Sequence, residues 1–497
     1  MGIPDEAFTP IEGDDKEICR RFKRVNREER EGQGRLFVAT TEPWERLGDL
    51  AASMTRLDMA PDDSIEGIRE KERMYEAMVR SGSYLDGRFW ADSWCAAFVW
   101  KKTGDFTYPI TEEVFRRIEH NPHACDEWMR EEIARLSQQY QFFHWHLAFP
   151  DVFRIPIGTA AENEQTGWNG GFDVVLGNPP WERLQFEERA YFASLASEIS
   201  LEGNQHRRRQ LIRDLASSNP VLFHMWKDAS REKAAETELI RNSQRFPLSA
   251  VDKFNTYAVF TELGLQLNHA GGSCGLIVKA GLITDKICAE LFSASSRARR
   301  LKSVYEFENR KKLFAEVDTR ERFALVSFAH NVRDAEFSFD NLDAESARDE
   351  GRIFRMSYED IVLLSPNTGN CPKFPSPVEL EIARSCYHRF PPMITKLPLS
   401  NPWNLSIDRY INVSDFSDEI VFWDDSMDSR ATGFNAAWDY APLFEGKLLH
   451  QYDHRFATYV GVTENSPTEE ILNKNPTVQA AWTTIQIGKS QSGTSFR

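Results

Sequence analysis

The sequence predicts an α/β fold with a mostly helical N-terminal region, a parallel sheet and a mixed α/β C-terminal region. Residues 172–176 form a short apolar run that follows a glycine-containing turn and ends at Gly177. Such a run is typical of a strand that is buried on both faces of a parallel sheet. Residues 254–278 contain a segment with the apolar spacing of a helix, then two glycines and a second apolar run. This order is the pattern of a βαβ crossover.

The N-terminal region, residues 1–140, is polar and rich in charged side chains of both signs. Residues 66–79 and 126–139 show helical spacing and charge pairing, so both are expected to be helices. Residues 92–100 are apolar, and their secondary structure is left open. Gly32-Gln33-Gly34 does not follow a predicted strand, which favours a flexible turn over a nucleotide-binding loop.

The end of the first predicted strand carries an unusual tetrapeptide, Asn178-Pro179-Pro180-Trp181. Two consecutive prolines fix the backbone and remove two N–H donors, so the carbonyl groups just before them have no local helix to join. Asn178 contributes a side-chain amide, and Trp181 contributes a flat face with one polar edge. Ligands of open α/β sheets bind at the carboxyl ends of the strands. The tetrapeptide therefore predicts a site for a planar molecule that bears an amino group.

The rest of the core is expected to contain one helix and three further strands. Residues 254–267 form the helix, and its apolar stripe should pack on the sheet. The stripe consists of Tyr257, Phe260, Leu263 and Leu267. Gly271-Gly272 is expected to end the helix with a left-handed cap. The strands are expected at residues 274–278, 301–307 and 322–328.

From about residue 334 the pattern changes. Short alternating segments such as residues 335–339 lie among turns rich in proline, asparagine and serine, and no βαβ rhythm continues. Residues 371–377 have the composition of a loop.

The composition restricts the partners and the compartment. The net charge of −16 argues against a protein that is basic all over, but a local basic cleft could still bind DNA. No apolar run is long enough to span a membrane, and the acidic N-terminus does not resemble a secretory signal, so no membrane partner is expected. Seven cysteines without a Cys-x-x-Cys pair fit a reducing cytoplasm.

The tetrapeptide after an apolar strand resembles the catalytic motif of S-adenosylmethionine-dependent amino-methyltransferases, above all N6-adenine-specific DNA methyltransferases. Residues 142–153 and 441–459 resemble segments of large, Type IIG-like restriction–modification methylases, which join methylation and cleavage in one polypeptide. The resemblance implies a partial Rossmann-like class I methyltransferase sheet, with the catalytic core at residues 141–332. It also implies a target-recognition region at residues 333–497, which is expected to stop before a domain of the usual size is complete.

The resemblance further implies roles for individual residues. The Asn178 side chain and the Pro179 carbonyl would accept hydrogen bonds from the target amine, Pro180 would complete the motif, and Trp181 would stack on a flipped base. Phe314 is a candidate for holding the base, although a plain core position is favoured. Lys279 departs from the family, which commonly has proline there. Basic residues that could face DNA, with solvated helix faces as the alternative, are Arg207, Arg208, Arg209, Arg299, Arg300, Lys311 and Lys312.

The resemblance implies S-adenosylmethionine as methyl donor, double-stranded DNA as substrate and a restriction subunit as a further partner. Family members bind the donor through a glycine-rich loop after the first strand and an acidic residue after the second, and neither is recognisable here. Three explanations remain open: the cofactor-binding half lies on a separate polypeptide, the chain is a truncated descendant, or the loop has diverged.

Other motifs favour structural roles, and no metal site is predicted. His144 and His146 could suggest a metal, but packing among aromatic neighbours is favoured because no partner cluster accompanies them. His450, Asp453 and His454 have ligand-like spacing, but structural or DNA-facing roles are favoured. Gly488-Lys489-Ser490 resembles half of a phosphate loop, yet Thr483 stands where that loop requires glycine.

Two competing functions are compatible with the tetrapeptide. A protein-glutamine methyltransferase could use the same acceptors, but such enzymes are compact and carry their cofactor loop just upstream. A DNA-recognition subunit, or a catalytically incomplete remnant, would keep the fold and lack the cofactor half. Binding of S-adenosylmethionine distinguishes this second alternative from an active methyltransferase.

Overall fold

The computed structural model describes residues 2–32, 48–104, 108–154, 161–163, 165–390, 392–396, 399–402 and 404–405, and three short strands beyond them. The chain divides into two compact units, residues 1–401 and 402–497. In the second unit, β11 (Ile420–Phe422), β12 (Tyr440–Leu443) and β13 (Thr483–Gln486) form an antiparallel sheet in the order β11-β13-β12. The motif residues His450, Asp453, His454 and Gly488-Lys489-Ser490 lie outside the described residues.

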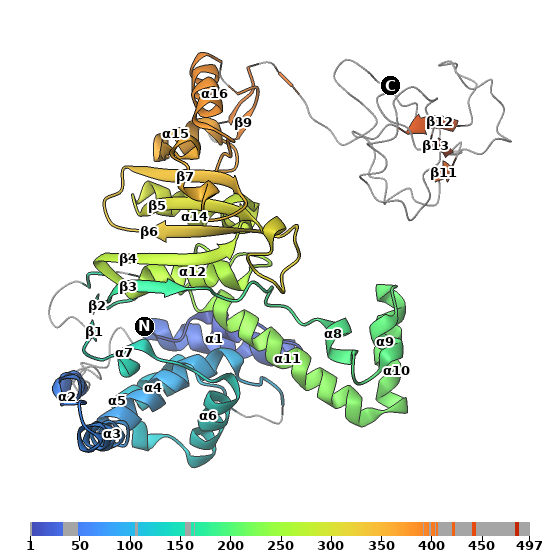
Figure 1. Ribbon diagram of the computed structural model, residues 1–497. Helices are drawn as coiled ribbons and strands as arrows, with labels where there is room; N and C mark the ends of the chain where they lie inside the picture. Colours follow the sequence, from blue (N-terminus) through green and yellow to red (C-terminus); the bar gives the residue numbers. More distant parts are fainter. Residues whose placement is uncertain are drawn as a thin grey trace. The chain divides into compact units, whose positions relative to one another are not determined.

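Helices dominate the N-terminal part of the first unit (Figure 1). They are α1 (Lys16–Gly32), α2 (Gly48–Met59), α3 (Ile65–Val79), α4 (Gly82–Val99), α5 (Glu112–His120) and α6 (Glu127–Tyr140). The two helices predicted at residues 66–79 and 126–139 are confirmed as α3 and α6. The apolar residues 92–99 belong to α4, and its buried face packs with α1, α5 and α6 in one core. No helix within the described ranges is long and apolar enough to cross a membrane.

A six-stranded sheet follows in the order β3-β4-β6-β5-β7-β8 (Figure 1). Its strands are β3 (Phe172–Gly177), β4 (Asn268–Lys279), β5 (Leu301–Glu308), β6 (Arg322–Phe328), β7 (Asp334–Asn341) and β8 (Phe354–Ser357). β3 and β4 are parallel, and so are β5 and β7, whereas β6 runs antiparallel to both β4 and β5. The α/β class and the predicted strands are confirmed, but the sheet is mixed rather than parallel. It also extends through β7 and β8, past the boundary expected near residue 333.

The crossover between β3 and β4 is long. A hairpin of β1 (Phe153–Arg154) and β2 (Asn169–Gly170) precedes β3. The crossover contains α8 (Glu188–Phe192), α9 (Ser197–Leu201), α10 (Gln205–Ser218), α11 (Pro220–Asn242) and α12 (Thr256–Leu267). α10 and α11 are separated at Asn219-Pro220, because the Asn219 side chain accepts the Leu222 N–H and caps α11, with Pro220 in its first turn.

The predicted helix at residues 254–267 is confirmed as α12, but two details were wrong. Phe260 does not join the packed stripe, because its side chain is 44% exposed, whereas Tyr257 and Leu267 are buried. Gly271 and Gly272 do not cap the helix, since α12 ends at Leu267 and both glycines lie inside β4. Glycine is required at position 272 for a different reason: a Cβ there would lie 2.6 Å from the Phe172 carbonyl oxygen.

The main core lies on one face of the sheet. Cys274, Leu276 and Val278 of β4 point towards it and are buried. The helices that supply its other side include α12, α13 (Gly281–Thr284), α14 (Ala289–Arg297), α15 (Tyr358–Leu364) and α16 (Pro377–Arg389). This burial explains why β4 and β6 were readable from the sequence, since each alternates buried residues with less buried ones.

The prediction that β3 is buried on both faces was wrong. Among the residues that the structure describes, β3 is an edge strand that pairs with β4 alone, and its side chains Val174 and Leu176 are 59% and 78% exposed. The apolar run was read correctly as a strand, but apolar composition alone does not show whether both of its neighbours belong to the same chain.

Candidate functional site

The predicted tetrapeptide lies at one edge of the six-stranded sheet, where several strand ends meet. β3, β4 and β5 all run in the same direction, so their carboxyl ends lie at this edge, and antiparallel β6 begins there. Asn178 follows β3, Lys279 ends β4, Asn309 follows β5 and Arg322 begins β6. This edge therefore gathers residues from segments about 150 positions apart in the sequence, as expected for a site in an α/β sheet.

Two hydrogen-bond acceptors stand free at the end of β3. Asn178 is exposed, and its side-chain amide makes no hydrogen bond to any residue that the structure describes. The neighbouring Pro179 is buried, and its carbonyl oxygen likewise accepts no hydrogen bond within the described part of the chain. The Pro180 carbonyl differs, because it accepts from the Thr256 hydroxyl at 2.7 Å. The first two oxygens of the motif thus remain available to a ligand, while the third is used by the fold.

Thr256, the first residue of α12, fixes the backbone behind these acceptors. Its hydroxyl oxygen lies 2.7 Å from the Pro180 carbonyl and 2.9 Å from the Glu182 carbonyl, and it accepts the Glu182 N–H at 3.2 Å. The Thr256 N–H also donates to the Glu182 carbonyl at 3.0 Å. The sequence did not predict this role of Thr256, because its partners are more than 70 positions away and no local motif indicates the contact.

Trp181 belongs to an aromatic cluster at the same edge. Its indole N–H donates to the Ile277 carbonyl of β4 at 3.3 Å, and this hydrogen bond holds the ring over β4. The ring stacks on Phe323, with centroids 6.1 Å apart and planes 25° apart, and Phe314 meets it edge-on at 5.6 Å and 74°. Phe307 stacks on the far side of the cluster against Phe323. The sequence-predicted candidates Trp181 and Phe314 are therefore brought into contact.

The loop that carries Phe314 is organised by one buried side chain, Asn309. Its amide nitrogen donates to the Phe314 and Val317 carbonyls, both at 2.9 Å, and lies 3.3 Å from the Asp318 carbonyl. Its amide oxygen accepts the Phe314 N–H at 3.0 Å. Asn309 is fully buried, so these hydrogen bonds satisfy groups that water does not reach. This second residue missed by sequence reasoning sets the position of Phe314.

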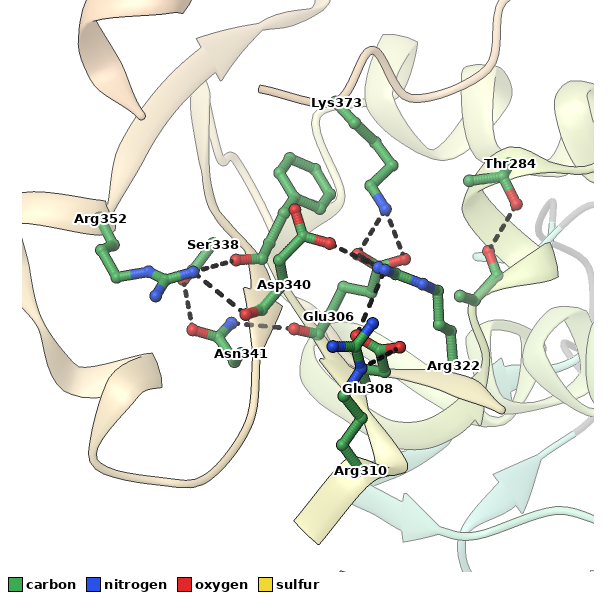
Figure 2. Close-up of polar contacts among 12 residues, drawn as sticks. Thr284, Glu306, Glu308, Arg310, Arg322, Ser338, Asp340, Asn341, Arg352 and Lys373 are labelled. Carbon is green, nitrogen blue, oxygen red and sulfur yellow. Dashed lines mark hydrogen bonds and ion pairs between the residues drawn. The ribbon is translucent and has the colours of Figure 1, made fainter. Parts of the chain in front are cut away.

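A charged network braces the same strand ends from the side of β7 (Figure 2). The Glu306 carboxylate is almost completely buried and pairs with Lys373 at 2.6 Å and Arg322 at 3.3 Å. Arg322 also pairs with Asp340 at 2.5 Å and Glu308 at 3.5 Å. The pKa of the Arg322 guanidinium is raised, chiefly by its hydrogen bond to Asp340. Arg322 therefore remains charged and ties β5, β6 and β7 together.

Further hydrogen bonds complete this network. The Asn341 amide donates to the Glu306 carbonyl at 2.9 Å and accepts from Ser338 at 3.1 Å, and Arg352 donates to two carbonyls near the end of β7 (Figure 2). Burial acts to raise the pKa of Asp340, but the hydrogen bond from Arg322 and the charges of Lys373 and Arg352 lower it overall. The network is a rigid support, because each of its acids faces a cation.

The predicted DNA-facing basic residues differ in exposure and in whether they form ion pairs or hydrogen bonds within the protein. Arg207 and Arg209 are exposed on α10, whereas Arg208 pairs with Glu188 at 2.9 Å. Arg300 points inward and donates to the Leu265 carbonyl at 3.1 Å.

The other predicted basic residues lie at opposite ends of β5. Arg299 precedes β5, at the sheet edge opposite Asn178. Lys311 and Lys312 follow β5 at the same edge as Asn178, and Lys311 forms an ion pair with Asp343. The clusters thus do not form one continuous set around the tetrapeptide.

His144 and His146 pack rather than ligate within the described residues. His144 lies 2.7 Å from an Asp92 carboxylate oxygen, and the His146 Nε2 atom is buried without a hydrogen-bond partner in that part of the chain. No group of three or more potential metal ligands occurs among the residues described. Burial, and secondarily the neighbouring His144, lowers the pKa of His146 to about 3.

Comparison with known families identifies the segment around the tetrapeptide. Residues 75–206 match the Eco57I restriction-modification methylase family. The matched segment contains Asn178 to Trp181 and, among the N-terminal helices, α4, α5 and α6. It resembles a restriction–modification methylase. A comparison with curated proteins gives no match.

Solved structures with some similarity include three restriction–modification proteins. The ATP-dependent Type ISP restriction-modification enzyme LlaBIII bound to DNA matches with 11% identity and a TM-score of 0.22, over 39% of this chain and 12% of that one. A modification subunit of a putative type I restriction enzyme from Vibrio vulnificus YJ016 matches with 11% identity and a TM-score of 0.21, over 61% and 62%. A type I R-M system complex matches with 10% identity and a TM-score of 0.22, over 78% and 90%. The chain spans less than two thirds of the first three structures it matches.

Proposed function

We propose that this protein is a site-specific, adenine-specific DNA methyltransferase of a restriction–modification system. It would transfer a methyl group from S-adenosylmethionine to N6 of an adenine flipped out of double-stranded DNA in the cytoplasm. The observation that carries this proposal is the pair of free acceptors, Asn178 and Pro179, at the carboxyl end of β3. The match of residues 75–206 to a restriction–modification methylase family supports the same reaction class.

The acceptor pair addresses the main chemical difficulty of the reaction. The exocyclic amine of adenine is a weak nucleophile because its lone pair is delocalised into the ring. Hydrogen bonds from that amine to the Asn178 and Pro179 oxygens favour a more tetrahedral nitrogen and stabilise the positive charge that develops on it. Such preorganised groups commonly lower a barrier by about 3–4 kcal/mol. Thr256 keeps the backbone of the motif in place for this purpose.

The aromatic residues would receive the flipped base. Flipping costs a few kcal/mol, and stacking on an aromatic side chain returns about 1–3 kcal/mol per base. One side of the Trp181 ring lies against Phe323, and Phe314 stands at its edge. The base would therefore meet the remaining surface of Trp181, with Phe314 as a side wall. The exposed basic residues Arg207, Arg209 and Lys312 would contribute contacts to DNA phosphates.

S-adenosylmethionine does not fit the residues described at this edge. The segments after β3, β4 and β5 contain no glycine-rich loop within the described ranges. We therefore assign no residue of this chain to the methyl donor and derive no step through it. The chemistry that the donor supplies is an electrophilic methyl group on a sulfonium.

Sequencing that detects modified bases tests the proposal in cells. The chain is expressed, together with its neighbouring gene products, in a bacterial host without adenine methylation. N6-methyladenine should appear at one recurrent sequence and should be absent with Asn178→Ala. Modification of another base, or none in any combination, would refute the proposed reaction.

A second candidate is a DNA-recognition subunit that is catalytically incomplete without a partner. The exposed edge strand β3 and the lack of a donor loop among the described residues favour it. Titration calorimetry separates the candidates, because a complete enzyme binds S-adenosylmethionine alone and an incomplete subunit binds it only with its partner.

A further inference from the structure

A cavity rich in arginine lies at the edge of the sheet opposite Asn178. β5 begins at this edge, and antiparallel β6 ends there. β7 begins there as well, whereas β8 ends there and continues into α15. The cavity has a volume of about 300 Å³, and its lining consists of Arg297, Arg299, Arg333, Tyr358 and Glu359. We call it the arginine cavity.

Backbone hydrogen bonds hold the walls of the arginine cavity together. The Val332 N–H donates to the Arg299 carbonyl at 2.8 Å, which joins the turn after β6 to the end of α14. β7 and β8 pair at this edge, so Arg333, just before β7, lies beside Tyr358, just after β8. The lining residues therefore come from three segments whose relative positions are set by the sheet.

Arg299 occupies a backbone position at which glycine is usually preferred. α14 ends at Arg297, and Arg299 follows with a left-handed φ of 55°. Helices commonly end with glycine in this conformation, because a Cβ is strained there. Packing does not explain the arginine, since its side chain is exposed. The strain is instead accompanied by a guanidinium group in the wall of a cavity, which is the kind of place where strained residues have functional roles.

The charges in the lining favour an anion. The Arg299 and Arg333 side chains form no ion pair or hydrogen bond with any residue that the structure describes. Arg297 lies 3.5 Å from Glu290, but both side chains are more than half exposed, so this pair is weak. Three guanidinium groups and the Glu359 carboxylate give the lining a charge of +2, in a chain whose net charge is −16.

The chemistry of the lining matches a phosphate group joined to a small polar molecule. Guanidinium groups bind two phosphate oxygens at once, and the Tyr358 hydroxyl can donate a further hydrogen bond. The volume of about 300 Å³ exceeds what one phosphate ion needs and lies at the lower end of the range for small-molecule sites, roughly 300–1,000 Å³. The Glu359 carboxylate can accept hydrogen bonds from hydroxyl groups, and it repels a second phosphate.

We propose that the arginine cavity binds a small phosphate monoester that carries hydroxyl groups. A monoester has almost two negative charges at pH 7, which balance the +2 of the lining. The DNA backbone fits less well, because each phosphodiester has one charge and is followed by another, and Glu359 faces the same space. The site lies at the edge opposite Asn178, so this inference does not depend on the proposed function.

Thermal unfolding and titration calorimetry of the full chain test this site. Inorganic phosphate and ribose 5-phosphate are the probes, and sodium chloride at the same ionic strength is the control. Both probes should raise the thermal midpoint, and ribose 5-phosphate should bind more tightly because its hydroxyl groups can reach Glu359. Arg333→Gln should weaken the binding of both probes by at least about tenfold, since a charged hydrogen bond is lost. Arg348→Gln is the matched control, because Arg348 is exposed and lies outside the lining.

Two substitutions of Arg299 separate ligand binding from damage to the fold. Arg299→Gly relieves the strain of the left-handed backbone, so the thermal midpoint without phosphate should rise while binding weakens by at least about tenfold. Arg299→Gln keeps a Cβ and removes the charge, so it should weaken binding to the same degree without the gain in stability.

Four results would overturn the inference. A midpoint that rises no more with phosphate than with chloride would exclude an anion site. Equal binding by the wild type, Arg299→Gly and Arg333→Gln would place the bound phosphate elsewhere. Ribose 5-phosphate that binds no more tightly than inorganic phosphate would exclude the ester. If fluorescence anisotropy showed that both variants weaken duplex DNA binding as much as phosphate binding, the occupant would be the DNA backbone.

Discussion

At the scale of single residues, the exposed Asn178 side chain makes no hydrogen bond to any residue that the structure describes. The Asn178→Leu substitution should therefore leave the free energy of unfolding unchanged within about 0.5 kcal/mol. The same substitution at Asn309, which is buried and fully hydrogen-bonded, should lower it by about 2 kcal/mol or more, because buried backbone groups lose their partners. Urea denaturation of both variants measures the difference, and equal stabilities would contradict the roles given to the two amides.

His146 makes a second prediction at this scale. Its pKa of about 3 in the folded protein lies below the ordinary value of 6.5, chiefly because of burial. Below pH 6.5 the unfolded chain therefore binds a proton that the folded chain does not, and stability falls until the pH reaches the folded pKa. The loss from this residue should be about 2 kcal/mol between pH 6.5 and 5.

Urea denaturation at several pH values compares the wild type with His146→Leu, in which this slope should be smaller. His206→Leu, on the exposed surface of α10, is the control and should keep the wild-type slope. If His146→Leu and the wild type lose stability in parallel, the assigned cause is wrong.

The residues of the site were only partly predictable from the sequence. Asn178 to Trp181 are consecutive in the sequence, so their residue types alone predicted a site for an amine. Thr256 hydrogen-bonds a segment more than 70 residues away in the sequence. Asn309 holds its loop because it is buried, and no local sequence pattern predicts that burial. Both contacts exist only after the strands have been brought to one edge.

At the scale of elements, the loop between β5 and β6 positions Phe314, and Asn309 holds that loop. Asn309→Asp keeps an acceptor for the Phe314 N–H but places a carboxylate against three carbonyl groups. We expect the KM for DNA to rise more than kcat falls, because in the proposed function Phe314 would contact the base rather than the amine. Phe314→Leu should show the same pattern, and steady-state kinetics with both variants measures it. A fall in kcat alone would contradict a positioning role.

Most elements could be predicted because their periodicity reflects burial within this chain. α6, α12, β5 and β6 follow this rule. β3 was read correctly as a strand and wrongly as buried, since no residue that the structure describes covers its apolar side chains Val174 and Leu176. The prediction of a helix cap at Gly271-Gly272 was wrong for a different reason. Glycine is needed both where a helix ends and where one strand's backbone lies close to its neighbour, as β4 does to β3 at Gly272.

At the scale of the whole molecule, a net charge of −16 has to coexist with DNA binding. Contacts should therefore come from a few exposed cations, each of which adds to the fall of affinity with salt. Arg207→Ala and Arg209→Ala should each reduce the slope of log K against log salt by about 0.9. Arg208 pairs with Glu188 and donates to a carbonyl of the same region, so Arg208→Ala should lower stability more than it changes the slope. Fluorescence anisotropy over a salt series measures the slopes, and identical slopes for all four proteins would exclude α10 from the DNA contact.

Methyl transfer by the wild type and Asn178→Ala, each with its flanking gene products, tests whether Asn178 holds the amine of adenine for methylation. Radiolabelled S-adenosylmethionine and unmethylated DNA are supplied, and both the transfer rate and the DNA affinity are measured. We predict that label enters N6 of adenine with the wild type, and that Asn178→Ala lowers the rate by about 10²–10³-fold while DNA affinity changes little. Equal rates for the two proteins, or label in protein rather than in adenine, would contradict the account.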